Sequence, residues 1–279
     1  MWAQRPDQLA PRIGEDEVPA SVYDERYFLE ECEGSGLYLA SAGRDLPRRL
    51  RVAMDLAAVR QGEIVADLGC GRGEVAAACA VAGARVWAVD YSPAALSIAR
   101  RTMKALVPSQ HALVNLLSSK VSNLPFRDQS INVVLMLDIV EHLRPRELAM
   151  TLAEVHRVLQ PGGRLVVHTM PNRWYYTYGY PLFRFCQRLR GHSLPANPRD
   201  RWEYAGRVHV NEQDVRSLRS SLRAAGFQSR VWVTSVTGSP QEGPLFGLLR
   251  RALAFAYPLN LVFCNDLFAV ARKPLDAKG

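Results

Sequence analysis

The sequence predicts an α/β protein built on one doubly wound, mostly parallel sheet. Between about residues 63 and 169, apolar stretches with the length of buried strands alternate with stretches of helical periodicity. The first strand runs into VADLGCGRGEVA at 65–76, where three glycines occupy every second position behind an acid. Strand, glycine turn and helix in this order form the entry to a nucleotide site in such a sheet.

The elements can be assigned in order along the chain. Strands are expected at 63–67, 84–90, 131–138 and 164–169, with a weaker one in HALVNLL at 111–117 and two late ones near 229–235 and 261–271. Helices are expected at 74–82, 92–106, 145–159 and 211–227. Gly83 suits the end of the first helix, whereas Ser92 is the predicted N-cap of the second and Pro93 lies in its first turn. Ligands of such sheets bind outside the carboxyl ends of the strands.

The chain is expected to form a single domain at 21–279 behind a poorly ordered terminus at 1–20. Its four parts are N-terminal helices at 21–60, a cofactor-binding core at 61–172, an insertion at 173–207, and a late helix with the last strands at 208–273. The sequence contains no internal repeat and no low-complexity tract.

Composition is that of a soluble globular protein, with 48% hydrophobic and 22% charged residues among 279. No apolar run has the length needed to span a bilayer. The first twenty residues hold prolines and acids where a signal peptide needs an apolar core, so we expect a cytoplasmic protein. The five cysteines are odd in number and lack paired spacing, which indicates neither a disulfide framework nor a zinc site.

The formal net charge of +8 is unevenly distributed. Residues 172–230 hold eleven arginines, no lysine and four acids, a net charge of +7. Two interpretations stay open at this point: a solvated basic face, or a patch that attracts an anionic partner.

The spacing of the glycine turn distinguishes between two cofactors. Asp90 closes the second strand about twenty residues beyond the glycines, where an acid holds ribose hydroxyls of either a dinucleotide or S-adenosylmethionine. A dinucleotide site has the spacing G-x-G-x-x-G, whereas this turn reads G-x-G-x-G, and Glu74 at the start of the helix would repel a pyrophosphate. S-adenosylmethionine carries a sulfonium and an ammonium, which nearby acids such as Asp67 and Asp138 attract. We therefore expect S-adenosylmethionine, and an NAD-dependent oxidoreductase is disfavoured.

Four motifs in order carry a family resemblance: VADLGCGRGEVA, VWAVDYSPAAL, NLPFRDQSINVVLMLDIVEHL and LAEVHRVLQPGGRLVVHTMPN. They resemble the class I S-adenosylmethionine-dependent methyltransferases, and within them the small-molecule branch that includes the ubiquinone-biosynthesis O-methyltransferases. The match is close over residues 64–172. It implies a seven-stranded sheet with a reversed last strand, methyl transfer from S-adenosylmethionine, Gly69 and Gly71 against the methionine part, and Asp90 on the ribose.

From these motifs the predicted cofactor-binding residues are Asp67, Gly69, Cys70, Gly71, Asp90, Tyr91, Asn123 and Asp138. One position departs from the family: Lys120 stands where an aspartate usually lies near the adenine amino group. A lysine cannot accept the hydrogen bond of that amine. Either Ser119 or Ser122 replaces the aspartate, or the adenine is held by backbone groups and by stacking on Tyr91, and cofactor affinity is then lower than usual.

The acceptor is less well defined by the sequence. The fourth strand ends in LDIVEHL, which lacks the N-P-P-Y-like turn of enzymes that methylate nucleobase amines, so a nucleic-acid partner is not expected, although RNA methylation of another kind stays an alternative. The insertion interleaves aromatic residues with arginines, as either a packed cap or a lid over the acceptor. The apolar segment 244–261 is either a buried or an interfacial helix. Both segments suit a lipid-linked or otherwise amphipathic anionic acceptor and peripheral membrane contact.

For the chemistry, we predict O-methylation by in-line displacement with His142 as the base. A hydroxyl acceptor must lose its proton, and a neutral imidazole can take it. His168 and His209 are weaker candidates, and a purely local structural role of His142 is an equal alternative. No metal is predicted, although Asp138, Glu141 and His142 in D-x-x-E-H resemble the E-x-x-E-H metal ligands of some related O-methyltransferases. A non-catalytic homologue is a further alternative, and the sequence defines neither the acceptor nor the oligomeric state.

Overall fold

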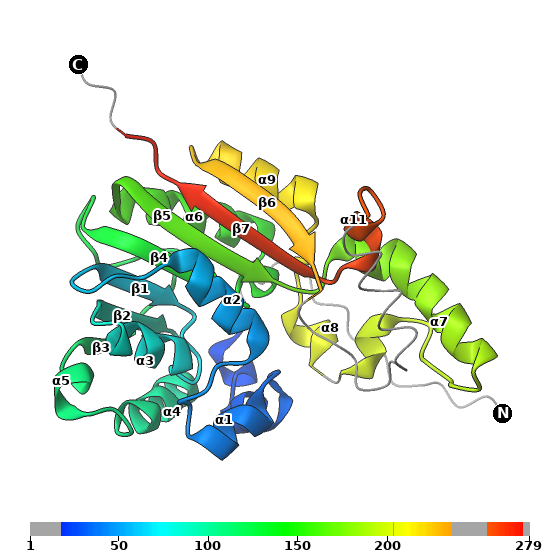
Figure 1. The fold of residues 1–279 in the computed structure, drawn as a ribbon, viewed down its shortest axis with the longest axis horizontal. Helices are drawn as coiled ribbons and strands as arrows, with labels where there is room; N and C mark the ends of the chain where they lie inside the picture. Colours follow the sequence, from blue (N-terminus) through cyan, green and yellow to red (C-terminus); the bar gives the residue numbers. More distant parts are fainter. Residues whose placement is uncertain (1–17, 203, 236–255, 276–279) are drawn as a thin grey trace.

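The computed structural model describes residues 18–202, 204–235 and 256–275, and its centre is a seven-stranded sheet (Figure 1). The strand order is β3-β2-β1-β4-β5-β7-β6. The strand β7 pairs antiparallel with both of its neighbours, β5 and β6, and the other pairs are parallel. The strands are β1 Ile64–Leu68, β2 Arg85–Asp90, β3 Val114–Ser118, β4 Ile131–Leu137, β5 Leu159–Thr169, β6 Gln228–Thr234 and β7 Asp266–Arg272. The predicted fold class is confirmed, including the reversed last strand.

Helices fill the connections between the strands. The α-helices are α1 Ser35–Ser41, α2 Arg48–Ala57, α3 Glu74–Val81, α4 Pro93–Met103, α5 Pro108–His111, α6 Pro145–Val158, α7 Tyr180–Leu189, α8 Ala205–Val208, α9 Val215–Ala224 and α11 Asn260–Phe263. Short 3₁₀ or π segments are η1 Ala20–Val22, η2 Tyr27–Glu31, η3 Val140–His142, η4 Tyr175–Gly179 and η5 Pro198–Arg201. The segments 1–17 and 236–255 lie outside the described residues, and with them most of the terminus expected to be disordered and most of the predicted apolar helix at 244–261.

Several predicted boundaries shift for local reasons. The late helix begins at Val215 rather than 211, because the Asp214 carboxylate accepts the amide hydrogens of Arg216 and Ser217 and so caps the helix there. The fifth strand begins at Leu159, so the Q-P-G-G sequence forms an irregular part of β5 instead of a separate turn. The last strand begins at Asp266, because residues 260–263 form α11. The predicted cap of α4 is confirmed, since Ser92 Oγ accepts from Ala95 N at 3.2 Å.

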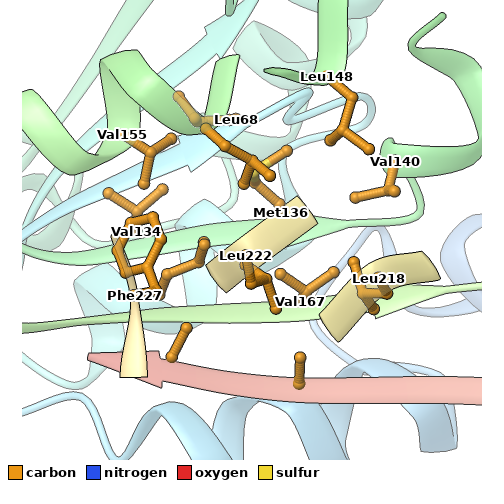
Figure 2. Packing of buried hydrophobic residues seen from close by; sticks show 14 of the residues in the cluster. Leu68, Val134, Met136, Val140, Leu148, Val155, Val167, Leu218, Leu222 and Phe227 are labelled. Carbon is orange, nitrogen blue, oxygen red and sulfur yellow. The ribbon is translucent and has the colours of Figure 1, made fainter. Parts of the chain in front are cut away.

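The core lies on both faces of the sheet. On one face, α6 and α9 pack over the central strands, and Figure 2 shows Leu218 and Leu222 of α9 among this cluster. On the other face, α2, α3 and α4 pack against β1, β2, β4 and β5. Burial from both sides explains why β4 is a continuous apolar run instead of an alternating one.

The N-terminal helices do more than precede the sheet, because they cover its carboxyl edge. Arg72, in the glycine turn after β1, donates to the carbonyl oxygens of Phe28 at 3.2 Å and Glu33 at 3.1 Å. Tyr27 and Phe28 of η2 are buried in an aromatic cluster with Tyr23 and Tyr204. The segment from residue 18 to Glu33 is thereby held over the glycine turn.

The packing of α9 gives a test of the core. Leu222 is fully buried between α9 and the sheet. Leu222→Ala should lower the free energy of unfolding by about 2 to 5 kcal/mol, because the substitution removes buried methyl groups and leaves a cavity. Denaturant titration of wild type and variant measures the difference. Leu39→Ala, at a side chain that is 61% exposed, is the control, and equal losses in both variants would contradict the packing described.

Candidate active site

A cavity of about 520 Å³ opens at the carboxyl edge of the sheet. It is bounded by the glycine turn, the N-terminal segment, the loop after β4 and the insertion. Eight predicted site residues line it: Asp67, Gly69, Cys70, Gly71, Asp90, Tyr91, Asp138 and His142. Asn123 is not among the lining residues, and Lys120 and Val121 of the same loop line the cavity instead.

The glycine turn brings backbone to the cavity surface. Gly69 and Gly71 have φ values of +71° and +48°, in the left-handed region that favours glycine. A Cβ at Gly69 would lie 2.6 Å from Ile139 Cδ1, so a side chain there would displace a neighbour. The turn is held by Asp90, whose carboxylate accepts from Gly71 N at 3.0 Å and Ser92 N at 2.8 Å. Asp90 therefore has a structural role that the sequence did not reveal, and its oxygens keep further lone pairs for a ligand.

Asp67 supplies a buried acceptor without a partner. Its side chain is 3% exposed, and its Oδ2 atom makes no hydrogen bond within the described residues. Burial, together with the charges of Asp90 and Glu74, raises the pKa of Asp67 to about 7. A buried carboxylate with a free oxygen gains from a cationic ligand group, and the ammonium of S-adenosylmethionine is one.

The negative charge of Glu74, which was expected to repel a pyrophosphate, is paired in the structure. Both of its carboxylate oxygens accept from the Arg72 guanidinium at 2.8 Å, and both side chains are buried. This pairing balances the charge that was expected to repel a pyrophosphate. The case against a dinucleotide therefore rests on the glycine spacing and the surrounding acids.

Asp138 is held in a buried network of alternating charge. Its carboxylate accepts from Arg49 Nε at 2.7 Å and contacts His168 Nδ1, and His168 Nε2 lies 3.3 Å from Asp266 Oδ1. Arg49 and His168 hold the pKa of Asp138 well below its usual range, and despite burial the two carboxylates raise the pKa of His168 to about 9. His168 is thus cationic at neutral pH and cannot serve as a base.

Arg49 is a site residue that sequence reasoning missed. It lines the cavity, and its Nη1 atom, 3.4 Å from Glu33 Oε1, makes no hydrogen bond in the part of the chain that the structure describes. Nothing in LPRRLRVAM distinguishes this arginine from Arg48 and Arg51, its two neighbours in α2. Its function depends on where α2 packs against the sheet.

His142 lies in a second, uncharged polar cluster. Its Nδ1 atom is 3.0 Å from the Tyr23 hydroxyl, and its Nε2 atom is 3.9 Å from Glu141 Oε1. The Thr169 hydroxyl donates to Glu141 Oε2 at 2.6 Å. Burial, with a smaller effect of His209, lowers the pKa of His142 to about 3, and burial raises that of Glu141 to about 8. Both groups are therefore neutral at pH 7.

His209 joins this cluster from a distant part of the sequence. The backbone N–H groups of Val210 and Asn211 both donate to the carbonyl oxygen of Glu141. These hydrogen bonds hold the segment that follows the insertion beside η3. Ligand atoms of Glu141, His142 and His209 lie within 4.8 Å of one another. Two imidazoles and a carboxylate can hold a divalent transition metal, so the set that the fold assembles differs from the D-x-x-E-H set by His209 in place of Asp138.

The two candidate replacements for the missing adenine aspartate differ in their position. The Ser119 hydroxyl donates to the carbonyl oxygens of Lys120 at 3.2 Å and Asn123 at 3.1 Å, and neither Ser119 nor Ser122 lines the cavity. Tyr91 does line it, with its hydroxyl donating to Val18 O at 2.8 Å. Stacking on Tyr91 and backbone contacts of the 120–121 loop are the features that this geometry offers to an adenine.

The cavity also has an aromatic wall, part of which lies beside the glycine turn, since a Cβ at Gly71 would lie 3.4 Å from Phe28. Tyr23, Tyr27 and Phe28 come from the N-terminal segment, and Tyr176 and Trp202 come from the insertion. Trp202 Nε1 donates to Glu31 Oε2 at 3.1 Å, which ties the insertion to η2. The insertion therefore borders the cavity, as expected of a lid, and its closure over an acceptor stays a prediction.

Comparison with known proteins agrees with this geometry. A family model described as a methyltransferase domain matches residues 66–167. The demethylmenaquinone methyltransferase of Clavibacter sepedonicus is 31% identical over 194 residues, which cover 68% of this chain and 76% of that protein. The ubiquinone/menaquinone biosynthesis C-methyltransferase of Rubrivivax gelatinosus is 30% identical over 178 residues, covering 63% and 67%. The chain belongs to the class I S-adenosylmethionine-dependent methyltransferases.

The fold of this methyltransferase is also found in solved structures. A phosphoethanolamine N-methyltransferase of Haemonchus contortus, in complex with S-adenosyl-L-methionine, superposes with a TM-score of 0.58 over 90% of this chain and 60% of that one, at 16% identity. The predicted cofactor, S-adenosylmethionine, is confirmed, and the oxidoreductase and non-catalytic alternatives are set aside. Within the described segments, no helix combines the length and apolar character that crossing a membrane requires.

The role of Asp90 can be tested by binding. Asp90→Ala should weaken the affinity of this methyltransferase for S-adenosylhomocysteine more than about tenfold, because a charged hydrogen bond is worth about 1.5 to 3 kcal/mol and the glycine turn loses its anchor. Titration calorimetry measures the affinity, and thermal melting checks the fold. Asp55→Ala, at an exposed acid of α2, is the control. Unchanged affinity in a folded Asp90→Ala variant would show that the ribose lies elsewhere.

The His168 network gives a pH dependence of stability. The folded-state pKa of about 9 exceeds the usual 6.5, so the stabilisation is complete below pH 6.5 and is lost as pH rises through 9. We expect up to about 3 kcal/mol of unfolding free energy to be lost over this window. His168→Gln removes that step, whereas Asp67 and Glu141 titrate in both proteins. Parallel pH profiles for wild type and variant would contradict a cationic His168.

Proposed function

We propose that this methyltransferase transfers the methyl group to a hydroxyl oxygen of a small or lipid-linked aromatic acceptor of the quinol type, with His142 as the base. Relatives named for demethylmenaquinone and for ubiquinone/menaquinone biosynthesis support an acceptor of this class. The aromatic wall, with Tyr23, Tyr27 and Trp202, suits a planar ring. We further propose that the protein acts in the cytoplasm and, for a lipid-linked acceptor, at a membrane surface.

The cofactor supplies an electrophilic methyl group at its sulfonium, and the chain supplies its binding groups. In this proposal Asp67 holds the ammonium, Asp90 the ribose, and the backbone of Gly69, Cys70 and Gly71 contacts the methionine part. Arg49 lines the cavity, and its Nη1 lies 3.4 Å from Glu33 Oε1 without a hydrogen bond, so a guanidinium edge is at hand for the carboxylate of that part. The acid and the arginine would thus bind the two oppositely charged ends of one amino-acid group.

The single observation that carries the proposed chemistry is the neutral His142 of η3, which lines the cavity with a side chain that is 12% exposed. In-line displacement requires that the acceptor oxygen be aligned with the methyl group, and a base that removes its proton adds typically 10²–10⁴-fold. As the methyl group leaves, the sulfonium loses its positive charge, and His142 gains one with the proton. The net charge of the site is therefore unchanged by the reaction, which suits a cavity with little water to screen it.

The Tyr23 hydroxyl acts as a positioning group in this scheme. Its 3.0 Å contact with Nδ1 fixes the ring, so that Nε2 turns toward Glu141 and the cavity. An imidazolium at His142 would lower the pKa of Glu141, whose Oε1 lies 3.9 Å from Nε2, so that a carboxylate forms there and stabilises it.

The base can be tested by kinetics. His142→Ala should lower kcat at least about a hundredfold with an electron-rich phenol or hydroquinone acceptor, while the affinity for S-adenosylhomocysteine stays within about twofold. Because the pKa of His142 is lowered to about 3, wild-type kcat should show no fall near pH 6.5 on acidification. His111→Ala, at an exposed histidine of α5, is the control. Full activity of His142→Ala would leave alignment as the whole mechanism, and a carbon-methylated product would contradict transfer to oxygen.

A second role of the cluster is favoured by the arrangement of Glu141, His142 and His209. If these residues hold a divalent metal, EDTA should abolish activity and a divalent cation should restore it, and His209→Asn should lose activity together with bound metal. Activity that resists EDTA assigns His142 to proton transfer alone.

A further inference from the structure

The outer face of α7, with the turn before it, carries an apolar stripe. We define this stripe as Tyr178, Leu182, Phe185 and Leu189, whose side chains are 64%, 49%, 58% and 74% exposed. Their spacing of four, three and four residues puts them on one side of a helix. The opposite side is anchored in the protein by Tyr180 and Phe183, which are buried. The helix therefore has two apolar sides, and only one of them is covered within the described residues.

A neighbouring segment adds to this surface. Tyr257 and Leu259 are 80% and 45% exposed just before α11, and α11 packs against η4 at the start of the stripe. The contact is close, because Gly179 lies against the backbone of Val262. In Figure 1, α7 and α11 lie together at the end of the molecule that is far from β3. Apolar side chains thus gather on adjoining elements instead of being scattered singly over the surface.

The segment that carries the stripe has positively charged side chains but no negatively charged ones. Residues 172–199 contain five arginines and no acid. Arg173 and Arg199 pair with Asp214 and Glu212, outside that segment. The other three arginines, Arg184, Arg188 and Arg190, lie on α7 or directly after it, and Arg188 and Arg190 are exposed.

We propose that α7 is an interfacial helix that docks this protein on an anionic lipid surface, with the stripe inserted shallowly and Arg188 and Arg190 on the headgroups. Exposed leucine and aromatic side chains beside arginines on one helix are typical of such binding. The absence of acids favours an anionic bilayer over a second copy of this chain, whose same face would meet it with like charge.

The position of η4 connects this surface with the active site. Tyr176 lines the cavity, while Tyr178, two residues later in the same short segment, is exposed. One insertion therefore forms the acceptor wall on its inner side and the lipid-facing surface on its outer side. The inference rests on the proposed function in one respect: a lipid-linked acceptor would pass from the bilayer into the cavity along η4.

Vesicle binding tests the surface independently of turnover. The full chain, loaded with S-adenosylhomocysteine, is sedimented with vesicles of phosphatidylcholine alone or of phosphatidylcholine with phosphatidylglycerol. We expect binding to the anionic vesicles, weakened by high salt because exposed charges are screened. Phe185→Ser with Leu189→Ser, or Arg188→Gln with Arg190→Gln, should each lower the partition coefficient about tenfold or more.

Matched controls separate this surface from general effects. Leu39→Ser on α1 and Arg51→Gln on α2 remove an exposed leucine and an exposed arginine elsewhere, and both should bind vesicles like wild type. Each α7 variant should also keep its affinity for S-adenosylhomocysteine and its activity on a water-soluble acceptor, so a wrong acceptor class and a wrong surface give different results. Failure of wild type to bind anionic vesicles, or binding of both α7 variants as strong as that of wild type, overturns the proposal. Dimerisation in ultracentrifugation that Phe185→Ser with Leu189→Ser abolishes would assign the face to a second copy instead.

Discussion

The charge network around Asp138 is the interaction on which the site depends. It joins α2, β5 and β7 to the end of β4 through Arg49, Asp138, His168 and Asp266, of which only Asp138 is partly exposed, at the cavity. Such networks add little stability relative to apolar packing, but loss of one member leaves a buried charge uncompensated, at a cost of about 3 to 5 kcal/mol. These ion pairs hold the Arg49 side chain at the cavity. They also fix the position of Asp138, from which the chain continues into η3.

Two kinds of polar environment follow from that arrangement. Near the glycine turn the side chains are charged or await a charged ligand, as with Asp67 and Arg49. Near η3 the side chains of Glu141 and His142 are kept neutral by burial. A zwitterionic amino-acid group matches the first environment and an apolar acceptor the second.

The N-terminal segment and the insertion are far apart in the sequence, and together they complete the cavity. Neither has a strand in the sheet, yet they meet where Trp202 donates to Glu31 and where Tyr27 packs on Tyr204. The aromatic wall therefore belongs to the parts of the sequence outside the matched domain at 66–167. Loops and insertions on a rigid sheet are where acceptor specificity varies within a common fold.

The sequence by itself determined the sheet, its helices and the cofactor. Strand and helix periodicity, the glycine turn, and the acids at the strand ends are local signals, so the positions of Asp67, Gly69, Gly71 and Asp90 at one edge followed from them. What lies next to these residues was decided only by tertiary structure. Glu74 pairs with Arg72, Arg49 pairs with Asp138, and His209 comes within 4.8 Å of Glu141. No periodic pattern encodes such contacts. Asn123 is a further example. Its motif predicted a cofactor contact from this loop, but Lys120 and Val121 of the loop line the cavity and Asn123 does not. Periodicity reports which face of an element is buried, whereas the partners on that face depend on how the whole chain packs.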